Sequence, residues 1–239
     1  KIKWYDPENL LCFGVGSLVG TMAPGACRVD VSTINVFSGG KGSANVGGFW
    51  GAELKYVGYD NIIIIGKSEK PVYLFINDNQ IEIRDANLIW GKTVFETEKI
   101  LRERLGDNDL KIAAIGPAGE NRVRGSAIII DTAKAAGGSG VGCVMGDKKL
   151  KAIVVRGHGK IEVDEPERFM RTVAKCYQQC KNEPNTKMMQ KAPLNLYSDP
   201  EWKGWDTNIV VKNGQDDQWE KENRVRLMNF KTGVPNMQK

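Results

Sequence analysis

The stretch that decides the fold class is Val72-Tyr-Leu-Phe-Ile-Asn-Asp-Asn-Gln-Ile-Glu-Ile-Arg84. Its two arms, residues 72–76 and 80–84, are rich in β-branched and aromatic side chains. Asn77-Asp78-Asn79 between them is typical of a hairpin turn. Similar short runs occur before and after this hairpin, with few helical segments between them. Strands that follow one another with few crossover helices favour an α+β fold over a doubly wound sheet.

The other strands are predicted from short apolar or β-branched runs bounded by glycine or polar residues. They cover residues 10–15, 29–36, 61–66, 112–115, 126–131, 141–145 and 152–156.

The clearest helix is predicted over residues 93–105. Thr93 and Glu96 have the spacing of a capping box, and Gly106 stands where a glycine commonly ends a helix. A shorter helix is expected over residues 49–57. The inner face of the longer helix is expected to consist of Val94, Thr97, Leu101 and Leu105.

Glycine content divides the chain into two parts. There are 24 glycines up to Lys160 and three beyond it. We therefore expect a glycine-rich, strand-rich domain over residues 1–160 and the start of a mainly helical domain over residues 161–239. The second part is predicted to contain helices over residues 166–181 and 219–227. Because the chain begins with lysine and ends without a closing element, we expect it to be a fragment of a longer protein.

Bulk composition is typical of a globular protein, with 41% hydrophobic and 26% charged residues. No stretch approaches the roughly 20 apolar residues of a membrane helix, and no signal peptide is visible. The five cysteines are odd in number and form no CxxC pair, so reduced thiols in the cytoplasm are expected. Cys176 and Cys180, four apart on a predicted helix, are interpreted as buried thiols rather than metal ligands.

The net charge of +5 is concentrated in residues 111–160, which contain nine Lys and Arg but three acidic residues. Charge patterning alone leaves two readings open: a solvated basic face, or a site for an anionic ligand. Nucleic-acid surfaces usually interleave aromatic residues with basic ones, and this segment has none. A compact phosphorylated cofactor fits the segment better.

Three glycine-rich stretches cover residues 14–28, 38–51 and 135–146. Glycine lets backbone amides approach a ligand closely, and successive amides form nests that bind anions. Tight turns in a β-rich domain are the alternative reading of each stretch. None of them has the pattern of a dinucleotide or P-loop site.

Side chains that could carry catalysis are scarce. His158 is the single histidine and lies in a turn-like setting, and Glu53 on a short helix is interpreted as structural. No nucleophile–base set can be built around that histidine. The reactive chemistry is therefore expected to belong to a bound cofactor, which the chain binds and orients.

An ordered series of motifs resembles the N-terminal domain of the aldehyde ferredoxin oxidoreductase family. The resemblance runs from about Pro7 to Gly159. Its motifs are Ala44-Asn-Val-Gly-Gly-Phe-Trp-Gly-Ala-Glu-Leu-Lys-Tyr-Val-Gly-Tyr-Asp60, Gly66-Lys-Ser-Glu-Lys-Pro-Val-Tyr73, Ile81-Glu-Ile-Arg-Asp-Ala86, Trp90-Gly-Lys92, Glu96-Thr-Glu98, Ile115-Gly-Pro-Ala-Gly-Glu-Asn121, Gly140-Val-Gly-Cys-Val-Met-Gly146 and Leu150-Lys-Ala152.

The resemblance implies a two-sheet β base that carries a tungsten bis-pterin cofactor, with the tungsten held by the pterin dithiolenes. It also implies a magnesium ion between the pterin phosphates, bound by the backbone carbonyls of Asn45 and Ala135. Arg28 would lie between the pterin and a neighbouring [4Fe–4S] cluster. The full implied cofactor-binding set is Arg28, Asn45, Val46, Gly47, Lys134, Ala135, Gly137, Gly138 and Gly140.

Two positions depart from the family pattern. The family commonly has arginine at the position of Lys134, and often again at the position of Gly138. Lysine keeps the charge but loses the bidentate fork of arginine, and glycine removes the contact. The cluster ligands and substrate contacts of the family are expected beyond this chain, so these residues alone are not expected to catalyse a reaction.

The leading interpretation is part of an enzyme that oxidises aldehydes to carboxylates and passes electrons to ferredoxin or an iron–sulfur subunit, within a homo- or hetero-oligomer. The first alternative is the catalytic subunit of a tungsten-dependent benzoyl-CoA reductase, which Gly47-Gly-Phe-Trp50 and the tryptophans at 202 and 205 favour slightly. The second is a non-catalytic relative that has lost the cofactor. Nucleic-acid binding by the basic segment is the weakest alternative.

Overall fold

The structure is a computed structural model that describes residues 1–191. It divides into two compact units, Lys1–Val173 and Ala174–Lys239, and each is described by itself. The helix predicted at 219–227 and the tryptophans at 202 and 205 lie outside the described residues. The domain boundary predicted at residue 160 stays a prediction.

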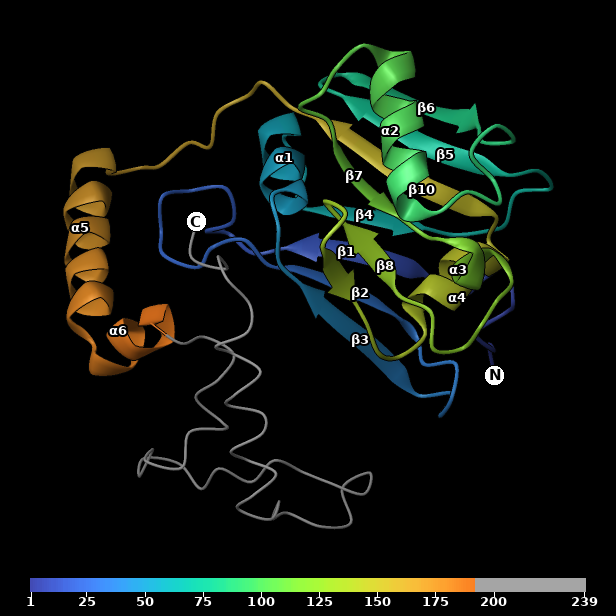
Figure 1. Ribbon diagram of the computed structural model, residues 1–239, viewed down its shortest axis with the longest axis horizontal. Helices are drawn as coiled ribbons and strands as arrows, with labels where there is room; N and C mark the ends of the chain where they lie inside the picture. The colour runs from blue at the N-terminus through green and yellow to red at the C-terminus, as the bar shows by residue number, and fades with distance from the viewer. Residues whose placement is uncertain (192–239) are drawn as a thin grey trace, which may run out of the picture. The chain divides into compact units, whose positions relative to one another are not determined.

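Two β-sheets form the first unit (Figure 1). Sheet A has the order β3-β2-β1-β4, and all of its pairs are antiparallel. Sheet B has the order β6-β5-β10-β7-β8-β9 and is mixed, because β10 pairs parallel with β5 and antiparallel with β7. The strands are β1 Leu11–Val15, β2 Val29–Ile34, β3 Lys41–Val46, β4 Asn61–Ile64, β5 Val72–Asn77, β6 Gln80–Asp85, β7 Lys111–Ala114, β8 Ile128–Ile130, β9 Lys134–Ala136 and β10 Leu150–Arg156.

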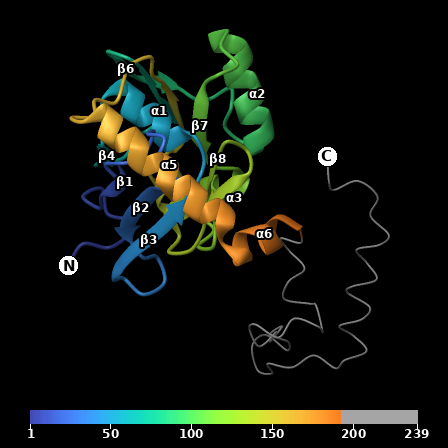
Figure 2. The same cartoon turned by 90° about the vertical axis from the view of Figure 1, so that its left-hand side faces the viewer.

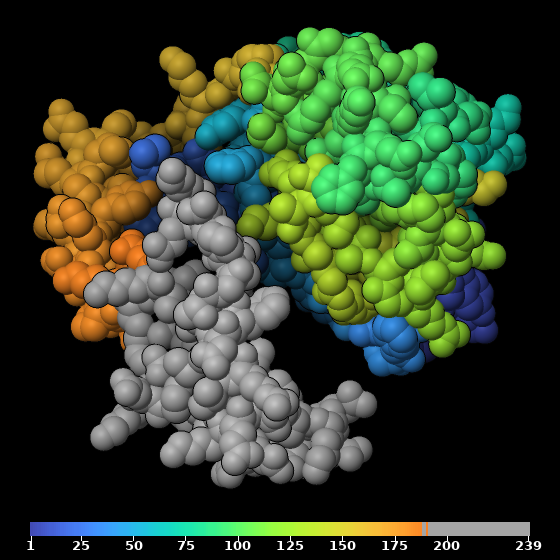
Figure 3. Space-filling view, viewed as in Figure 1, coloured from blue at the N-terminus to red at the C-terminus, as the bar shows by residue number. Residues whose placement is uncertain are grey.

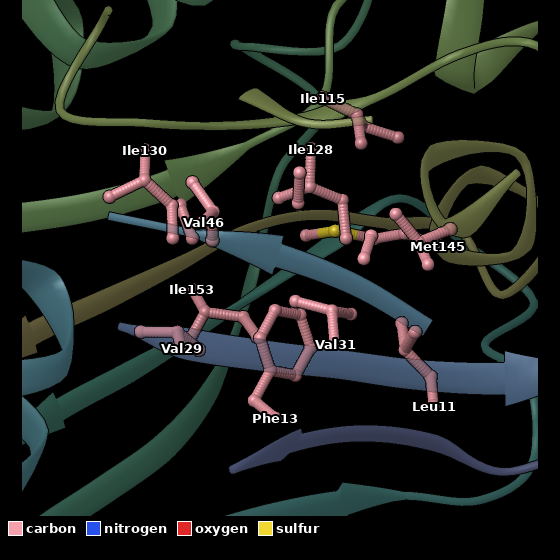
Figure 4. Packing of buried hydrophobic residues seen from close by; sticks show 14 of the residues in the cluster. Leu11, Phe13, Val29, Val31, Val46, Ile115, Ile128, Ile130, Met145 and Ile153 are labelled. Carbon is pink, nitrogen blue, oxygen red and sulfur yellow. The ribbon is translucent and has the colours of Figure 1, made fainter. Parts of the chain in front are cut away.

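The main core lies between the facing sides of the two sheets (Figure 4). Alternate residues of sheet A, such as Phe13 and Val31, point into it, as period-two patterning requires. Trp50 is fully buried against Phe13, and its indole N–H donates to the carbonyl of Ile153 in sheet B at 3.1 Å. Asp30 and Ser32 of β2 and Lys41, Ser43 and Asn45 of β3 lie on the opposite side, away from the core, whereas Thr33 is buried.

Helices close the sandwich and cover its outer side. In Figure 1, α1 and α4 lie at opposite ends of the core, and α2 covers the outer face of sheet B, as Figure 2 also shows. The helices are α1 Trp50–Val57, α2 Val94–Leu105, α3 Pro117–Glu120, α4 Val141–Asp147, α5 Pro166–Asn182 and α6 Pro184–Lys191.

The predicted caps of α2 are confirmed. The hydroxyl of Thr93 accepts from the amide of Glu96, the carboxylate of Glu96 accepts from the amide of Thr93, and Gly106 adopts a left-handed conformation. Thr97 and Leu101 are buried as expected. Glu98, which the sequence did not assign to the inner face, is buried beside them.

The strand predicted over residues 141–145 is wrong, because these residues form the first part of α4. A continuous apolar run fits a buried strand and a buried helix equally well, so periodicity could not decide between them. Residues Val141 to Gly146 are all buried, since this short helix lies inside the main core. Strands β3 and β9 and the short helix α3 were not predicted, because small and polar residues dominate them and give no run of β-branched or apolar side chains.

Helix α5 begins at Pro166 as predicted and ends at Asn182. The interpretation of its cysteines as buried thiols is wrong: Cys176 is half-buried and Cys180 is exposed. Among residues 1–191, no helix combines the length and the apolar character needed to cross a membrane.

Candidate cofactor-binding site

The polar face of sheet A carries the first group of predicted site residues. Arg28 immediately precedes β2 and Asp30 lies two residues later, so both side chains are on the side away from the core. Asn45 of β3 pairs with Asp30 across the ladder and is exposed. Strand alternation thus places a cation, a carboxylate and an amide on one open surface.

An open groove of about 590 Å³ runs over this surface. Arg28, Asp30 and Asn45 form one side of it, and the first glycine-rich stretch, including Gly14 and Gly16, forms much of the rest. Cys27 also lines the groove. The groove is therefore lined by residues from two of the three glycine-rich stretches, 14–28 and 38–51.

Asp30 is held in place by two hydroxyls. The hydroxyl of Ser32 donates to one carboxylate oxygen at 2.5 Å, and the hydroxyl of Ser43 on the neighbouring strand donates to the other. The sequence reading did not select Asp30, although its spacing of two residues from Arg28 could have identified it.

Gly47 and Gly48 connect β3 to α1 and lie between two basic side chains. A Cβ atom added to Gly47 would lie 3.9 Å from Nη1 of Arg28. A Cβ atom added to Gly48 would lie 3.7 Å from Cγ of Lys134 and 2.9 Å from Oδ2 of Asp131. Gly48 has φ +120°, which a residue with a side chain rarely adopts. The fold thus brings Arg28 next to Gly47 and the aliphatic stem of Lys134 next to Gly48.

Strand β9 and the loop after it form the second half of the predicted site. Lys134 and Ala135 are exposed, and Ala135 pairs with Ile129 across the ladder. A Cβ atom added to Gly137 or Gly138 would meet nothing within 4 Å, so the backbone there is open to a ligand. Together, Arg28, Asn45, Gly47, Gly48 and residues 134–138 are called the candidate cradle below.

Two of the predicted residues have side-chain positions that face the interior. The side chain of Val46 is buried in the main core, so only its backbone is available to a ligand. Gly140 is buried, and a Cβ atom there would lie 2.2 Å from Cγ2 of Val36. Close packing explains this glycine, and its contact with a cofactor stays a prediction.

The loop at residues 137–140 is fastened to the β2–β3 turn. The amide of Val36 donates to the carbonyl of Ser139 at 3.2 Å, and the Ser139 hydroxyl bonds the backbone of Ser43. Figure 3 shows the surfaces of this turn (blue) and of the yellow-green segment around residues 122–140 against each other. The second and third glycine-rich stretches are therefore joined by hydrogen bonds.

Much of the basic charge of residues 111–160 serves the fold. Lys151 is fully buried with Glu120, and Lys148 is buried with its ammonium 2.9 Å from the carbonyl of Gly66. Burial lowers the pKa of both lysines. Arg156 pairs with three acids, Glu53 among them at 2.9 Å, which confirms a structural role for Glu53. Lys148, Lys151 and Arg156 therefore serve the fold, whereas Arg122, Arg124, Lys134, Lys149 and Lys160 of the same segment are exposed.

His158 lies outside the candidate cradle. Its Nδ1 is 2.8 Å from Oδ2 of Asp78 in the β5–β6 turn, and both side chains are exposed. This pair holds the end of β10 to the hairpin turn and brings no nucleophile to the histidine.

The donor set of the candidate cradle fits an anionic, phosphate-bearing group. It offers open backbone at Gly137 and Gly138, together with the cations of Arg28 and Lys134. Within residues 1–191, no three His, Cys, Asp or Glu side chains are grouped so that they could hold a metal ion. In this part of the chain, a metal would depend on backbone carbonyls or on the cofactor for its ligands.

Comparison with known proteins agrees with this geometry. Residues 1–157 match the family model described as the N-terminal domain of aldehyde ferredoxin oxidoreductase. The chain belongs to the aldehyde ferredoxin oxidoreductase family. The tungsten-containing aldehyde ferredoxin oxidoreductase of Pyrococcus abyssi is 50% identical over 184 residues, which cover 77% of this chain and 30% of that protein. The chain thus spans about 30% of the length of such relatives.

Other members of the family have different activities in their names. The aliphatic sulfonate oxidoreductase, WOR-like subunit, of Pyrococcus furiosus is 40% identical over 70% of this chain and 29% of its own length. The solved active-site complex of benzoyl coenzyme A reductase with 1,5-dienoyl-CoA superposes with a TM-score of 0.74. It is 43% identical and covers 75% of this chain and 27% of its own. The α+β fold with two sheets is therefore confirmed, and the names of these similar proteins refer to different activities.

Proposed function

We propose that this chain is the cofactor-binding part of a tungsten-dependent oxidoreductase that converts aldehydes to carboxylates. The observation that carries the proposal is the placement of Gly47 and Gly48 between Arg28 and Lys134. Open backbone and two cations at this point suit the phosphates of a pterin cofactor. A bound tungsten bis-pterin would supply the redox chemistry, together with a [4Fe–4S] cluster that residues elsewhere in the protein would hold.

The roles of this chain's own residues follow from their positions. Arg28, which is exposed beside the groove, would neutralise cofactor charge on the side of the cluster. Gly137 and Gly138 would donate backbone N–H groups to phosphate oxygens. The carbonyls of Asn45 and Ala135 would share a magnesium ion, for which oxygen ligands are suited. Ferredoxin or an iron–sulfur subunit would accept the electrons, in an oligomeric and cytoplasmic enzyme.

A second candidate is the catalytic subunit of a benzoyl-CoA reductase. The 43% identity and the TM-score of 0.74 to a benzoyl coenzyme A reductase complex favour it. A third is a non-catalytic relative, which Lys134 and Gly138 favour because both weaken anion binding relative to arginine.

One experiment separates these candidates. The full protein that contains this chain is produced without oxygen in the presence of tungstate, and tungsten, molybdenum and pterin are measured. Aldehyde oxidation is followed with a viologen dye and with ferredoxin, and benzoyl-CoA reduction is assayed separately. Aldehyde-dependent reduction by a tungsten-loaded protein supports the leading proposal. Turnover of benzoyl-CoA alone supports the second, and a purified protein without metal or pterin supports the third.

A further inference from the structure

Asp131 bridges the two halves of the candidate cradle. It lies in the turn between β8 and β9, three residues before Lys134. Its Oδ2 accepts a hydrogen bond of 2.8 Å from the backbone N–H of Phe49, 82 positions away in the sequence. Phe49 immediately follows Gly48 and is the N-cap residue of α1. The side chain of Phe49 makes no capping hydrogen bond. One carboxylate therefore connects the glycine pair to the strand that carries Lys134 and Ala135.

The turn that presents Asp131 is unusual in its backbone. Asp131 has φ +49° and Thr132 has φ +55°, a region that disfavours residues with side chains. The buried carboxylate of Glu98 on α2 accepts the amide of Thr132 at 2.8 Å, which holds the turn. The second carboxylate oxygen of Asp131 is buried and has no hydrogen-bond partner among the described residues. Such a geometry persists only when the surroundings require it.

The close packing around Gly48 indicates which distance the hydrogen bond between Asp131 and Phe49 maintains. A Cβ atom at Gly48 would be 2.9 Å from Oδ2 of Asp131 and 3.1 Å from Cγ2 of Ile130, so carboxylate and glycine fit closely. Any movement of the turn away from α1 would widen the distance between Gly47 and Ala135. In the proposed function, the segments around Gly47 and Ala135 would bind the same phosphates and the same magnesium ion.

We propose that Asp131 is a positioning residue that holds the two halves of the candidate cradle at the separation the cofactor requires. This inference rests on the proposed function. The competing explanation is purely structural: a carboxylate near the N-terminus of α1 stabilises that helix whether or not a cofactor binds. A structural role predicts a loss of stability that is independent of metal retention.

Asp131→Gly is the most informative substitution, because glycine tolerates the positive φ and removes only the carboxylate. Asp131→Asn is the rescue variant, since asparagine also tolerates positive φ and keeps an oxygen that accepts from Phe49. Asp78→Gly is the control: it removes a carboxylate that also sits at positive φ and accepts a backbone N–H, from His158 at 2.9 Å, in the β5–β6 turn outside the candidate cradle. Each full-length protein is loaded with tungsten, and the melting temperature and the tungsten and pterin retained after dialysis are measured.

The expected result is that Asp131→Gly retains roughly fivefold less tungsten and pterin, the effect of about one net hydrogen bond. Asp131→Asn is expected to stay within about twofold of wild type, and Asp78→Gly to retain the cofactor although its melting temperature falls. Equal retention by Asp131→Gly and Asp78→Gly, with wild type loaded, overturns the positioning role and leaves the proposed function intact. A wild-type protein without tungsten, molybdenum or pterin overturns the proposed function and this inference with it.

Discussion

The ammonium of Lys151 lies 2.5 Å from a carboxylate oxygen of Glu120, and both side chains are buried. Lys151 also donates to the carbonyls of Ile115 and Lys92, at 2.7 and 2.8 Å. The other oxygen of Glu120 accepts from the amide of Gly91 at 2.8 Å. This ion pair therefore joins β10, α3 and the loop that leads into α2, and every hydrogen of the ammonium has a partner.

Replacement of this lysine is expected to destabilise the domain strongly. Lys151→Met leaves the buried carboxylate of Glu120 without its counterion, which costs about 3 kcal/mol. The double variant Lys151→Met/Glu120→Leu should cost less, because it removes both charges. Urea unfolding of the protein that contains this chain measures the difference. Lys99→Met on the exposed side of α2 is the control, with an expected change within about 0.5 kcal/mol. Equal losses for Lys151→Met and Lys99→Met would refute the role of the pair.

Two glycines of the same loop are expected to respond differently to alanine. At Gly140, with φ +74°, the new Cβ would lie 2.2 Å from Cγ2 of Val36 and 2.7 Å from the carbonyl oxygen of Arg124. Steric overlap adds to backbone strain there, so alanine at this position is expected to lower the free energy of unfolding by about 3 kcal/mol. At Gly138, with φ +83° and open space, only backbone strain of about 1 kcal/mol remains. Unfolding curves of the two variants check the order, and a larger loss at Gly138 would contradict the packing described for this loop.

Lys134 is expected to tune how firmly the cofactor is held. Lys134→Arg introduces a planar fork that binds a phosphate through two hydrogen bonds, so tungsten should be lost more slowly on dialysis than from wild type. Lys134→Ala removes the charge and should lose tungsten faster. Lys99→Arg on α2 is the matched control. Identical rates of tungsten loss in all four proteins would show that Lys134 does not contact the cofactor.

Arg28 is expected to act on the cofactor and not on the fold. Its side chain is exposed beside the groove, and none of the ion pairs of the described residues includes it. Arg28→Ala should therefore lower tungsten content, or slow electron transfer, with an unchanged melting temperature. Arg104→Ala, an exposed arginine of α2, should change neither quantity. Unchanged metal content and turnover in Arg28→Ala would remove the role proposed for this residue.

The capping box of α2 predicts a pH dependence. Hydrogen bonds from Thr93 hold the pKa of Glu96 below its ordinary value, so folding favours the charged form of this carboxylate. Its stabilising contribution is fully present above the ordinary pKa and is lost as the pH falls through the lower pKa of the folded state. The stability difference between wild type and Glu96→Gln should therefore be constant near neutrality and shrink in acid. A difference that grows on acidification would reverse the sign and contradict the capping geometry.

The sequence was most informative where local rules act alone. Thr93, Glu96 and Gly106 fix the ends of α2 through contacts within one helix, so their spacing predicts the structure directly. The β5–β6 hairpin was predicted for the same reason. Residues 141–145 were predicted wrongly because burial on all sides removes the periodicity that separates helix from strand.

Contacts between segments that are distant in the sequence could not be predicted from motifs and residue spacing. The family resemblance selected Arg28 and Lys134, yet nothing local indicates that Gly47 and Gly48 separate them. Asp131 accepts a hydrogen bond from the amide of Phe49, and no local sequence pattern predicts that these two residues are in contact. Spacing within the basic segment likewise did not indicate that Lys151 and Arg156 pair with acids in other elements. Pairings of this kind depend on the packed sheets and not on spacing along the chain.

The central claim is that the cofactor lies across Gly47 and Gly48, between Arg28 and Lys134. The most direct measurement is anomalous X-ray scattering at the tungsten edge from crystals of the loaded full-length protein. The account predicts a tungsten peak above the polar face of sheet A, with phosphate density against Gly137 and Gly138. A tungsten peak at another surface, with the candidate cradle filled by side chains of the rest of the protein, would contradict it.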